Sequence, residues 1–266
     1  MPASGVFRKA FMPDLRCFHR PAELEPSTIH LDRDESHHLI ATNRARVGDT
    51  VVAFDGRGKE WICECATADK RAAVLSVRFL QKQRPLPYRI TLAQALPKGR
   101  FMDSIVRKAT EIGAAQIAPL LSERTIARIE PGDDEHKLEK WEAAAIEAAK
   151  QCGNPWLPEI LPVQSAEAFV TSGSRDYHLR LIASLQPGSK SLREVLGRFR
   201  AEQKHDPVKV VWMIGPEGDF TTAEMALART HGFEAVSLGP LVLRCETAAI
   251  FALSILSYEL QNRPES

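Results

Sequence analysis

The stretch VKVVWMIGPEGDF (residues 208–220) joins a β-branched apolar run to a glycine loop, and TTAEMALARTHG (221–232) follows it. The run predicts a buried strand that ends abruptly at Gly215. Thr221 and Glu224 have the spacing of a capping box, so a helix is expected to begin directly after the loop. Strand, loop and helix in this order hold nucleotides in many proteins, although this loop matches neither the GxGxxG nor the GK[ST] phosphate pattern.

The loop offers a rigid main chain rather than charged ligands. Gly215 and Gly218 permit backbone conformations that other residues avoid, and Pro216 fixes one φ angle between them. Free amides at the carboxyl end of a strand can hold a small ligand. From this stretch alone, a structural turn and a ligand-binding loop are equally good interpretations.

A second stretch, SLGPLVLRCETAAIFALSIL (237–256), repeats the arrangement of strand, Gly-Pro loop and helix. Its loop is apolar (241–243) and carries one charge, Arg244, before a helix for which Thr247 is the expected cap. Two such loops at the ends of successive strands predict one pocket with apolar walls and main-chain donors. That pocket suits an adenine-like group better than a polyphosphate, because neither loop supplies a lysine or a run of glycines. Taken alone, Arg244 is equally well interpreted as a surface or salt-bridging residue.

Composition places the chain among ordinary soluble globular proteins. Its 266 residues are 44% hydrophobic and 26% charged, and the net charge is +1, so any contact with nucleic acid must come from a local basic patch. The five cysteines are scattered, and Cys63-Glu-Cys65 lacks the spacing of a CxxC metal site, which favours reduced thiols in a cytosol. No apolar segment near the N-terminus or elsewhere has the length of a signal or membrane span, so we expect a cytoplasmic protein without a membrane anchor.

The predicted secondary structure changes near residue 82, from short strands to alternating strands and helices. Three β-type runs, VVAF (51–54), WICEC (61–65) and AVLSVRF (73–79), predict an antiparallel meander or small barrel, and residues 35–49 before them predict a helix with Ser36 as its cap. QKQRPLPYR (81–89) is basic and carries two prolines, as linkers do. We therefore expect one domain over residues 1–82 and a second over residues 88–266.

Beyond the linker, strands and helices alternate. Strands are expected at 90–96, 115–121, 178–185, 208–215 and 233–239, and helices at 101–113, 134–154 and 246–261. Such alternation is typical of an α/β domain with a mostly parallel sheet covered by helices.

Taken together, these stretches resemble a known family. IGPEGDF (214–220) and LGPLVLRCETAA (238–249) resemble the S-adenosylmethionine-binding signature of SPOUT methyltransferases, and most of all the RsmE type, which methylates N3 of a uridine in small-subunit (16S) ribosomal RNA. ESHHLIATNRARVGDTVVAFDGRG (35–58) is similar to the PUA-like barrel of that family, and PKGRFMDSIVRKATEIGAAQIAPLLSERT (97–125) to its first Rossmann-like stretch. Four stretches in the right order make the match specific.

The resemblance implies a fold and partners that composition does not show. It implies an N-terminal PUA-like β-barrel that binds RNA and a C-terminal SPOUT Rossmann-like α/β domain whose chain forms a trefoil knot around residues 210–250. It also implies a homodimer with each S-adenosylmethionine pocket near the subunit interface. The expected substrate is 16S rRNA or the assembled small ribosomal subunit, and no metal is required.

The resemblance and the residue chemistry together assign candidate roles. Arg244 is the expected catalytic cation beside the uracil carbonyls, and Glu217 is either a base, a cofactor contact or a structural loop carboxylate. The expected cofactor-binding residues are Ile214, Gly215, Pro216, Glu217, Gly218, Leu238, Gly239, Leu241, Val242, Leu243 and Thr247. The expected RNA-binding residues are Arg44, Arg46, Arg57, Lys98, Arg100, Lys108 and Asn154.

Two positions depart from the family pattern. Asp219 stands where the family usually has a glycine, and Asn154 stands where it often has an arginine. Three rival functions remain: a non-catalytic RNA-binding or ribosome-assembly protein that has kept the fold, a SPOUT methyltransferase that acts on another RNA, and a small-molecule nucleotide enzyme. The last is disfavoured by the predicted barrel and the missing phosphate motifs.

Overall fold

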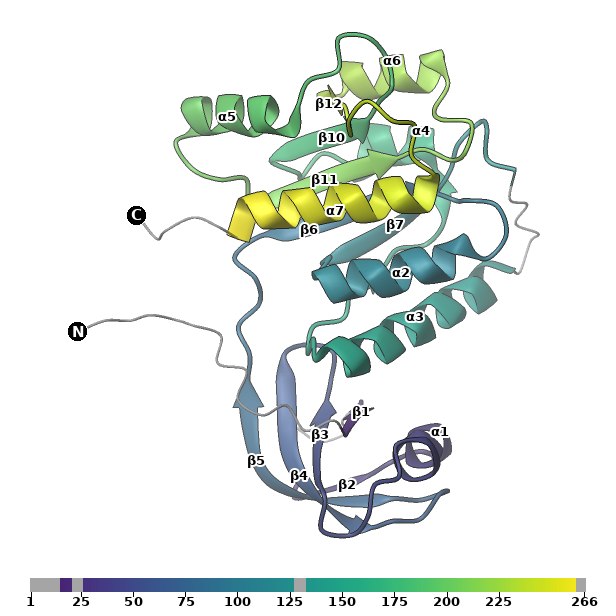
Figure 1. The fold of residues 1–266 in the computed structure, drawn as a ribbon, viewed down its shortest axis with the longest axis vertical. Coiled ribbons are helices and arrows are strands. Elements are labelled where there is room, and N and C mark those ends of the chain that lie inside the picture. Colours follow the sequence, from purple (N-terminus) through teal and green to yellow (C-terminus); the bar gives the residue numbers. More distant parts are fainter. Residues whose placement is uncertain (1–14, 21–25, 127–132, 262–266) are drawn as a thin grey trace. The chain divides into compact units, whose positions relative to one another are not determined.

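The chain folds into two compact units. The structure, a computed structural model, describes residues 15–20, 26–126 and 133–261. Unit 1 comprises Met1–Pro85 and Ala149–Trp156, and unit 2 comprises Leu86–Ala148 and Leu157–Ser266 (Figure 1). The predicted domain limits, 82 and 88, lie on either side of the break after Pro85, whereas Ala149–Trp156 joins unit 1 although it lies far along the chain.

Unit 1 is built on a five-stranded sheet in the order β1-β3-β4-β5-β2. Its strands are β1 (Arg16–Phe18), β2 (Thr28–His30), β3 (Thr50–Phe54), β4 (Lys59–Thr67) and β5 (Val74–Lys82). All pairings are antiparallel except β1 with β3. Alternate side chains of the predicted runs face a core that includes Trp61, Leu75 and Leu39, which confirms the predicted strands of the N-terminal region.

The helix predicted over residues 35–49 is shorter and begins earlier. It consists of α1 (Arg33–His37) and a π-helical turn, η1 (His38–Thr42). Asp32 caps it by accepting a hydrogen bond of 2.8 Å from the amide of Glu35. The expected cap, Ser36, is instead buried, and its hydroxyl accepts from the amide of Ala73 at 2.9 Å. The prediction was wrong because Asp32 offers an equally good capping side chain one turn upstream.

The segment Ala149–Trp156 is bound into unit 1 by both charge and packing. The Lys150 ammonium lies 2.8 Å from the Glu35 carboxylate, and both side chains are largely shielded from solvent. The amide of Gly58 donates to the carbonyl of Pro155 at 3.0 Å. A Cβ on Gly58 would lie 2.3 Å from the Trp156 ring, and Gly58 has a φ of +88°, so only glycine fits here.

Unit 2 contains a parallel sheet in the order β12-β10-β11-β6-β7-β8, with β9 also paired to β7. Its strands are β6 (Arg89–Ala95), β7 (Gln116–Leu121), β8 (Glu159–Ile160), β9 (Gln164–Ser165), β10 (Leu179–Ala183), β11 (Lys209–Ile214) and β12 (Phe233–Val236). Its helices are α2 (Phe101–Ile112), α3 (Asp133–Cys152), α4 (Ala166–Ala168) with the π-helical turn η2 (Phe169–Gly173), α5 (Leu192–Gln203), α6 (Thr222–Thr230) and α7 (Cys245–Gln261). The last residues of α3 belong to unit 1.

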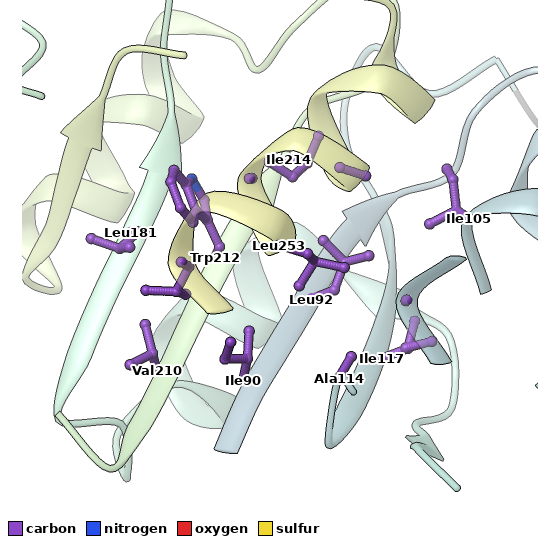
Figure 2. Close-up of a cluster of buried hydrophobic side chains, with 14 of the residues drawn as sticks. Ile90, Leu92, Ile105, Ala114, Ile117, Leu181, Val210, Trp212, Ile214 and Leu253 are labelled. Carbon is purple, nitrogen blue, oxygen red and sulfur yellow. The ribbon is translucent and has the colours of Figure 1, made fainter. Parts of the chain in front are cut away.

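Both faces of this sheet are buried, which explains the nearly continuous apolar runs. On β11, Val210, Trp212 and Ile214 face a core shared with α2 and α7, whereas Val211 and Met213 face a second core beneath α4 and α6. Figure 2 shows the first of these cores. The predicted α/β class and parallel sheet are therefore confirmed.

The expected strands and helices of this half are present, with ends displaced by at most three residues. The prediction lacked α5, the short strands β8 and β9, and α4. Gly113 ends α2 with a φ of +87°, as its place after the helical pattern predicts. All five cysteines are free thiols. No helix in the described residues has the length and apolar character needed to cross a bilayer.

Candidate active site

The candidate site lies at the carboxyl edge of the unit 2 sheet. Strand β11 lies between β10 and β6, and β12 borders β10. Because these strands are parallel, the loops that follow them gather at one edge, where ligands of open α/β sheets bind. Two of these loops are the predicted ones, which we name the first loop (215–221) and the second loop (237–244).

The first loop is a tight turn closed by its own backbone. The amide of Asp219 donates to the carbonyl of Pro216 at 2.9 Å, and Asp219 adopts a φ of +59°. A Cβ on Gly215 would lie 3.0 Å from Asp219 Oδ1 and 3.1 Å from its Cα. Phe220 is buried in the second core and anchors the end of the turn. A side chain at position 215 would therefore force the turn to shift by a few tenths of an ångström.

Neighbouring loops hold the first loop from two sides. Glu217 Oε1 accepts a hydrogen bond of 2.9 Å from the amide of Lys98, in the loop after β6. The Arg124 guanidinium, in the turn after β7, donates from Nη1 to the carbonyl of Gly218 at 2.7 Å. The first loop is thus held by the loops that follow β6 and β7, the next two strands of the sheet after β11.

The predicted capping box at the start of α6 is confirmed. The amide of Glu224 donates to the Thr221 hydroxyl at 3.2 Å, and the amide of Thr221 donates to Glu224 Oε2 at 2.8 Å. The other carboxylate oxygen of Glu224 accepts from the amide of Glu123 at 3.0 Å. This carboxylate therefore both caps α6 and ties its N-terminus to the turn that carries Arg124.

The second loop presents apolar side chains and free main-chain donors. Leu241 and Val242 are 72% and 79% exposed, which is unusual for adjacent aliphatic residues. The amides of residues 241–243 make no hydrogen bond with any described residue. Gly239 has a φ of +114°, and a Cβ added there would meet nothing within 4 Å. Exposed apolar walls beside unsatisfied amides fit an adenine-like group, as the sequence predicts.

The two loops meet at the start of α7. The Cys245 thiol lies 3.9 Å from Glu217 Oε1 and 3.4 Å from Glu246 Oε2. Burial raises the pKa of this thiol to about 12, with further contributions from Glu246 and Glu217. Arg244 immediately precedes Cys245 and is exposed. The structure therefore brings Arg244 and Glu217 to the same edge of the sheet.

Thr247 does not cap α7. The helix begins at Cys245, so Thr247 lies within its first turn and its side chain is exposed. The prediction placed the cap too late, because Arg244-Cys245-Glu246 carries no strong helix-breaking residue and the helix extends toward the loop. Ala248 donates its amide to the carbonyl of Arg244 at 2.8 Å, which closes that first turn.

Three residues predicted to bind the cofactor have side chains that pack inward. Ile214 is buried in the first core, and Leu238 and Leu243 pack against the same core. Their side chains pack into or against the first core, so only their main-chain groups face the carboxyl edge.

Sequence reasoning missed two contributors to this edge. The loop after β10 (184–190) lies between the other two, with the amide of Ser184 donating to Val236 and that of Ser237 donating to the carbonyl of Lys190. Its Gln-Pro-Gly turn signal was available in the sequence. Arg124 was visible only as part of the SERT motif, because nothing in sequence spacing links it to Gly218.

The predicted RNA-binding residues of unit 1 do not form one cluster. Arg44 and Arg46 precede β3, whereas Arg57 follows it, so they lie at opposite ends of that strand. Asn154 lies near Arg57, because Arg57 and Trp156 form a β-bridge. The Asn154 side chain accepts a hydrogen bond of 3.0 Å from the amide of Trp156, which gives it a local structural contact.

In unit 2, two of the predicted RNA-binding residues directly precede α2, and the third lies within it. Lys98 and Arg100 are exposed, and Lys98 adjoins the first loop through its amide. Lys108 is paired with Glu111 at 2.9 Å on the helix surface. Lys98 and Arg100 are therefore better placed than Lys108 to act beside the two loops. Among the described residues, no group of three His, Cys, Asp or Glu side chains is arranged to hold a metal ion.

The departure at Asp219 predicts a pH-dependent stability. Burial raises the pKa of its carboxyl above 3.8, opposed by the hydrogen bond from the amide of Phe220 and by Arg124. A carboxyl whose pKa is raised on folding binds its proton more tightly in the folded state, so stability falls as pH rises through that window. Asp219→Asn keeps the hydrogen bond and tolerates the positive φ without the charge. We expect this variant to have a higher Tm than wild type at pH 7.

Thermal unfolding followed at several pH values checks this expectation. The advantage of Asp219→Asn should shrink as pH falls below the raised pKa and vanish below about pH 3.8, where the wild-type carboxyl is protonated in both states. An equal difference at all pH values would show that the charge is not the cause.

Comparison with known proteins agrees with this geometry. A sequence model of the RNA methyltransferase domain matches residues 84–257, and one of the RNA methyltransferase PUA domain matches residues 31–78. The chain is 31% identical over 262 residues to ribosomal RNA small subunit methyltransferase E of Synechocystis sp., covering 98% of this chain and 83% of the relative. The enzyme of the same name from Bacillus subtilis is 28% identical over 89% of this chain and 92% of the relative.

Two solved structures share the whole fold. A Legionella pneumophila methyltransferase in complex with the cofactor SAM is 33% identical with a TM-score of 0.81, covering 92% of this chain and 97% of that one. Ribosomal RNA small subunit methyltransferase E of Neisseria gonorrhoeae, bound to S-adenosyl methionine, is 27% identical with a TM-score of 0.81 and the same coverage. The chain therefore belongs to the ribosomal RNA small subunit methyltransferase E family of RNA methyltransferases.

Proposed function

We propose that this protein transfers a methyl group from S-adenosylmethionine to N3 of one uridine in 16S ribosomal RNA. The observation that carries the proposal is the meeting of the first and second loops at the carboxyl edge of the sheet, joined by the contact of 3.9 Å between Cys245 and Glu217. Family membership and the relatives' names support the same activity.

Two features of the chain would hold the cofactor. The exposed apolar side chains of Leu241 and Val242 would offer a surface for the adenine, and the free amides of the second loop would supply hydrogen-bond donors for it. The first loop borders the same space with a backbone fixed by Lys98 and Arg124. Neither loop places a lysine side chain or a run of glycines there, in keeping with a cofactor that has no phosphate.

Two side chains act on the base. The cofactor supplies an electrophilic methyl group on a sulfonium. Uracil N3 becomes a good nucleophile only when its proton leaves, and the negative charge then spreads onto the carbonyl oxygens. Arg244 stabilises that charge from its exposed position before α7. Glu217 Oε2 accepts no hydrogen bond from the described residues, so it is available to take the proton or to contact the cofactor.

The target uridine must leave base pairing before it reacts, because N3 lies on the Watson–Crick edge. Lys98 and Arg100, exposed beside the first loop, are placed to hold the flanking phosphates in unit 2.

The substrate is made in the cytoplasm, and we assign the protein to that compartment. We also infer the trefoil knot of this family around residues 210–250, which agrees with α7 returning to pack on β6 and β11.

A titration with S-adenosylmethionine separates this proposal from a non-catalytic RNA-binding protein that has kept the fold. Calorimetry of the folded wild-type protein should give one saturable site per chain. Absence of binding by protein whose folding is verified by circular dichroism would refute the enzymatic function. The second loop favours the enzyme, since it places free main-chain donors beside exposed apolar side chains, as an adenine-like group requires.

We further propose that the protein is a homodimer formed through α7. The exposed residues of this helix recur at intervals of three or four and form one stripe: Thr247, Phe251, Ser254, Tyr258 and Gln261. Phe251 and Tyr258 are 42% and 66% exposed, and the apolar second loop continues the stripe at its N-terminal end. A helix face that exposes two aromatic rings without any charge is suited to pack against the same helix of a second copy.

Phe251→Asp is expected to convert the dimer to a monomer, because it places a charge in the middle of the stripe. Sedimentation velocity at micromolar concentration measures the change. Phe79→Asp is the matched control, since Phe79 is an exposed phenylalanine (57%) on β5 of unit 1. A monomeric wild type, or a dimer that survives Phe251→Asp, would contradict the proposed interface.

A further inference from the structure

Two lysines lie directly opposite each other at one end of unit 1. Lys59 begins β4 and Lys82 ends β5, and the two residues are cross-strand partners in the antiparallel ladder. Directly opposed residues have their Cβ atoms about 4.5–5.5 Å apart and their side chains on the same face. Like charges in such a pair repel, so this arrangement costs stability unless an anion lies between them.

Among the described residues, no carboxylate of unit 1 forms an ion pair with either lysine. The adjacent Glu60 points to the opposite face of the sheet, where its oxygens accept from Arg16 at 2.7 Å, Gln81 at 3.1 Å and Gln83 at 2.9 Å. Asp55 lies in the turn before β4, where its Oδ1 accepts from the backbone amides of Arg57 at 2.7 Å and Lys59 at 3.0 Å. Neither acid is therefore ion-paired with Lys59 or Lys82 in the described part of the chain.

Two arginines extend the same positive surface. Arg57 and Arg84 are exposed, and the amide of Gln83 donates to the carbonyl of Gly58 at 2.8 Å, which brings the chain around Arg84 beside the turn that carries Arg57. None of the four side chains has an ion-pair partner within the described part of the chain. We name these residues, Arg57, Lys59, Lys82 and Arg84, the basic end of unit 1.

The turn beneath the basic end is rigid. Gly58 packs against the Trp156 ring, and Arg57 is bridged to Trp156. A rigid backbone holds the charges close together at low entropic cost to a bound anion, whereas a mobile surface loop would let them spread apart. The repulsion is thus built into the fold rather than relieved by movement.

We propose that the basic end binds the sugar–phosphate backbone of the RNA substrate, with one phosphate between Lys59 and Lys82. This inference rests on the proposed function, because it assigns a contact surface for the same substrate. The sequence already points to Arg57 and the neighbouring Lys59 as RNA contacts; the pairing of Lys59 with Lys82 is visible only in the strand register. RNA is favoured over an acidic protein because phosphates spaced along one strand can satisfy several close cations in succession.

The test exploits the opposite effects of one substitution on stability and on binding. Lys82→Glu replaces the repulsion with a cross-strand ion pair to Lys59, so Tm should rise by about 1–3 °C. The same change should weaken binding to a single-stranded RNA fragment of 16S rRNA by roughly tenfold at low salt. It should also lower the slope of log Kd against log salt by about 0.7 or more. Affinity for S-adenosylmethionine should not change.

Lys70→Glu is the matched control. Lys70 is exposed in the turn at the other end of the β4–β5 hairpin, so the same charge reversal is made in the same unit. It should alter RNA affinity by less than about threefold. Equal weakening by both variants would overturn the proposal, and so would a lower Tm for Lys82→Glu or an unchanged RNA affinity. If wild type bound no cofactor and methylated no RNA, the proposed function itself would fail, which is a distinguishable result.

Discussion

Arg244→Ala is expected to lower kcat for RNA methylation by about 10²–10³ while leaving the Kd for S-adenosylmethionine within about threefold of wild type. The guanidinium stabilises negative charge that develops on the uracil carbonyls as N3 loses its proton, and this charge is absent from the cofactor complex. The structure places Arg244 after the apolar loop, exposed and next to Cys245, which contacts Glu217. Single-turnover methylation with labelled cofactor measures the chemical step separately from binding.

Two further variants sharpen this expectation. Arg244→Lys keeps the charge but not the planar fork, so it should recover part of the rate. Arg193→Ala removes another exposed arginine of unit 2, whose guanidinium lies 3.6 Å from Glu259, and should retain the wild-type rate. A larger effect of Arg244→Ala on cofactor affinity than on kcat would assign Arg244 to cofactor binding and contradict the catalytic role.

Gly215→Ala is expected to weaken S-adenosylmethionine binding by about 100-fold, which corresponds to about 2.7 kcal/mol. The added Cβ would lie 3.1 Å from the Cα of Asp219, and backbone cannot move away as a flexible side chain can. The turn is also held by Lys98 and Arg124, so the clash must displace the loop as a whole. Calorimetric titration gives the Kd, and thermal unfolding reports whether the fold survives.

Gly197→Ala serves as its control. Gly197 lies within α5, where an added Cβ meets nothing within 4 Å and the backbone does not require glycine. Alanine favours the helix by about 0.5–1 kcal/mol, so this variant should bind the cofactor normally and be slightly more stable. Cofactor affinity within threefold of wild type for Gly215→Ala would show that the first loop is not a wall of the pocket.

The elements that the sequence predicted well are those set by local chemistry. The β-branched run before Gly215 forms β11, and the spacing of Thr221 and Glu224 forms the capping box of α6. Both depend on residues within a few positions of each other, so periodicity and capping rules suffice to find them.

Features that depend on contacts distant in sequence were missed. Arg124 is hydrogen-bonded to Gly218, which lies 94 positions away, and Lys150 to Glu35, which lies 115 positions away. No local sequence pattern predicts either contact. The opposition of Lys59 and Lys82 depends on strand register, which pairing fixes only once the sheet is formed. The errors at Ser36 and Thr247 have another origin, because several neighbouring residues satisfy the same capping rule or helix pattern and packing selects among them.

The central claim is tested most directly on the RNA. Small-subunit RNA from cells lacking the gene should be incubated with purified protein and S-adenosylmethionine, digested to nucleosides and analysed by mass spectrometry. The account predicts one new N3-methyluridine per 16S rRNA with wild type, and its near absence with Arg244→Ala. An unchanged nucleoside profile with the folded, cofactor-binding wild-type protein would contradict it.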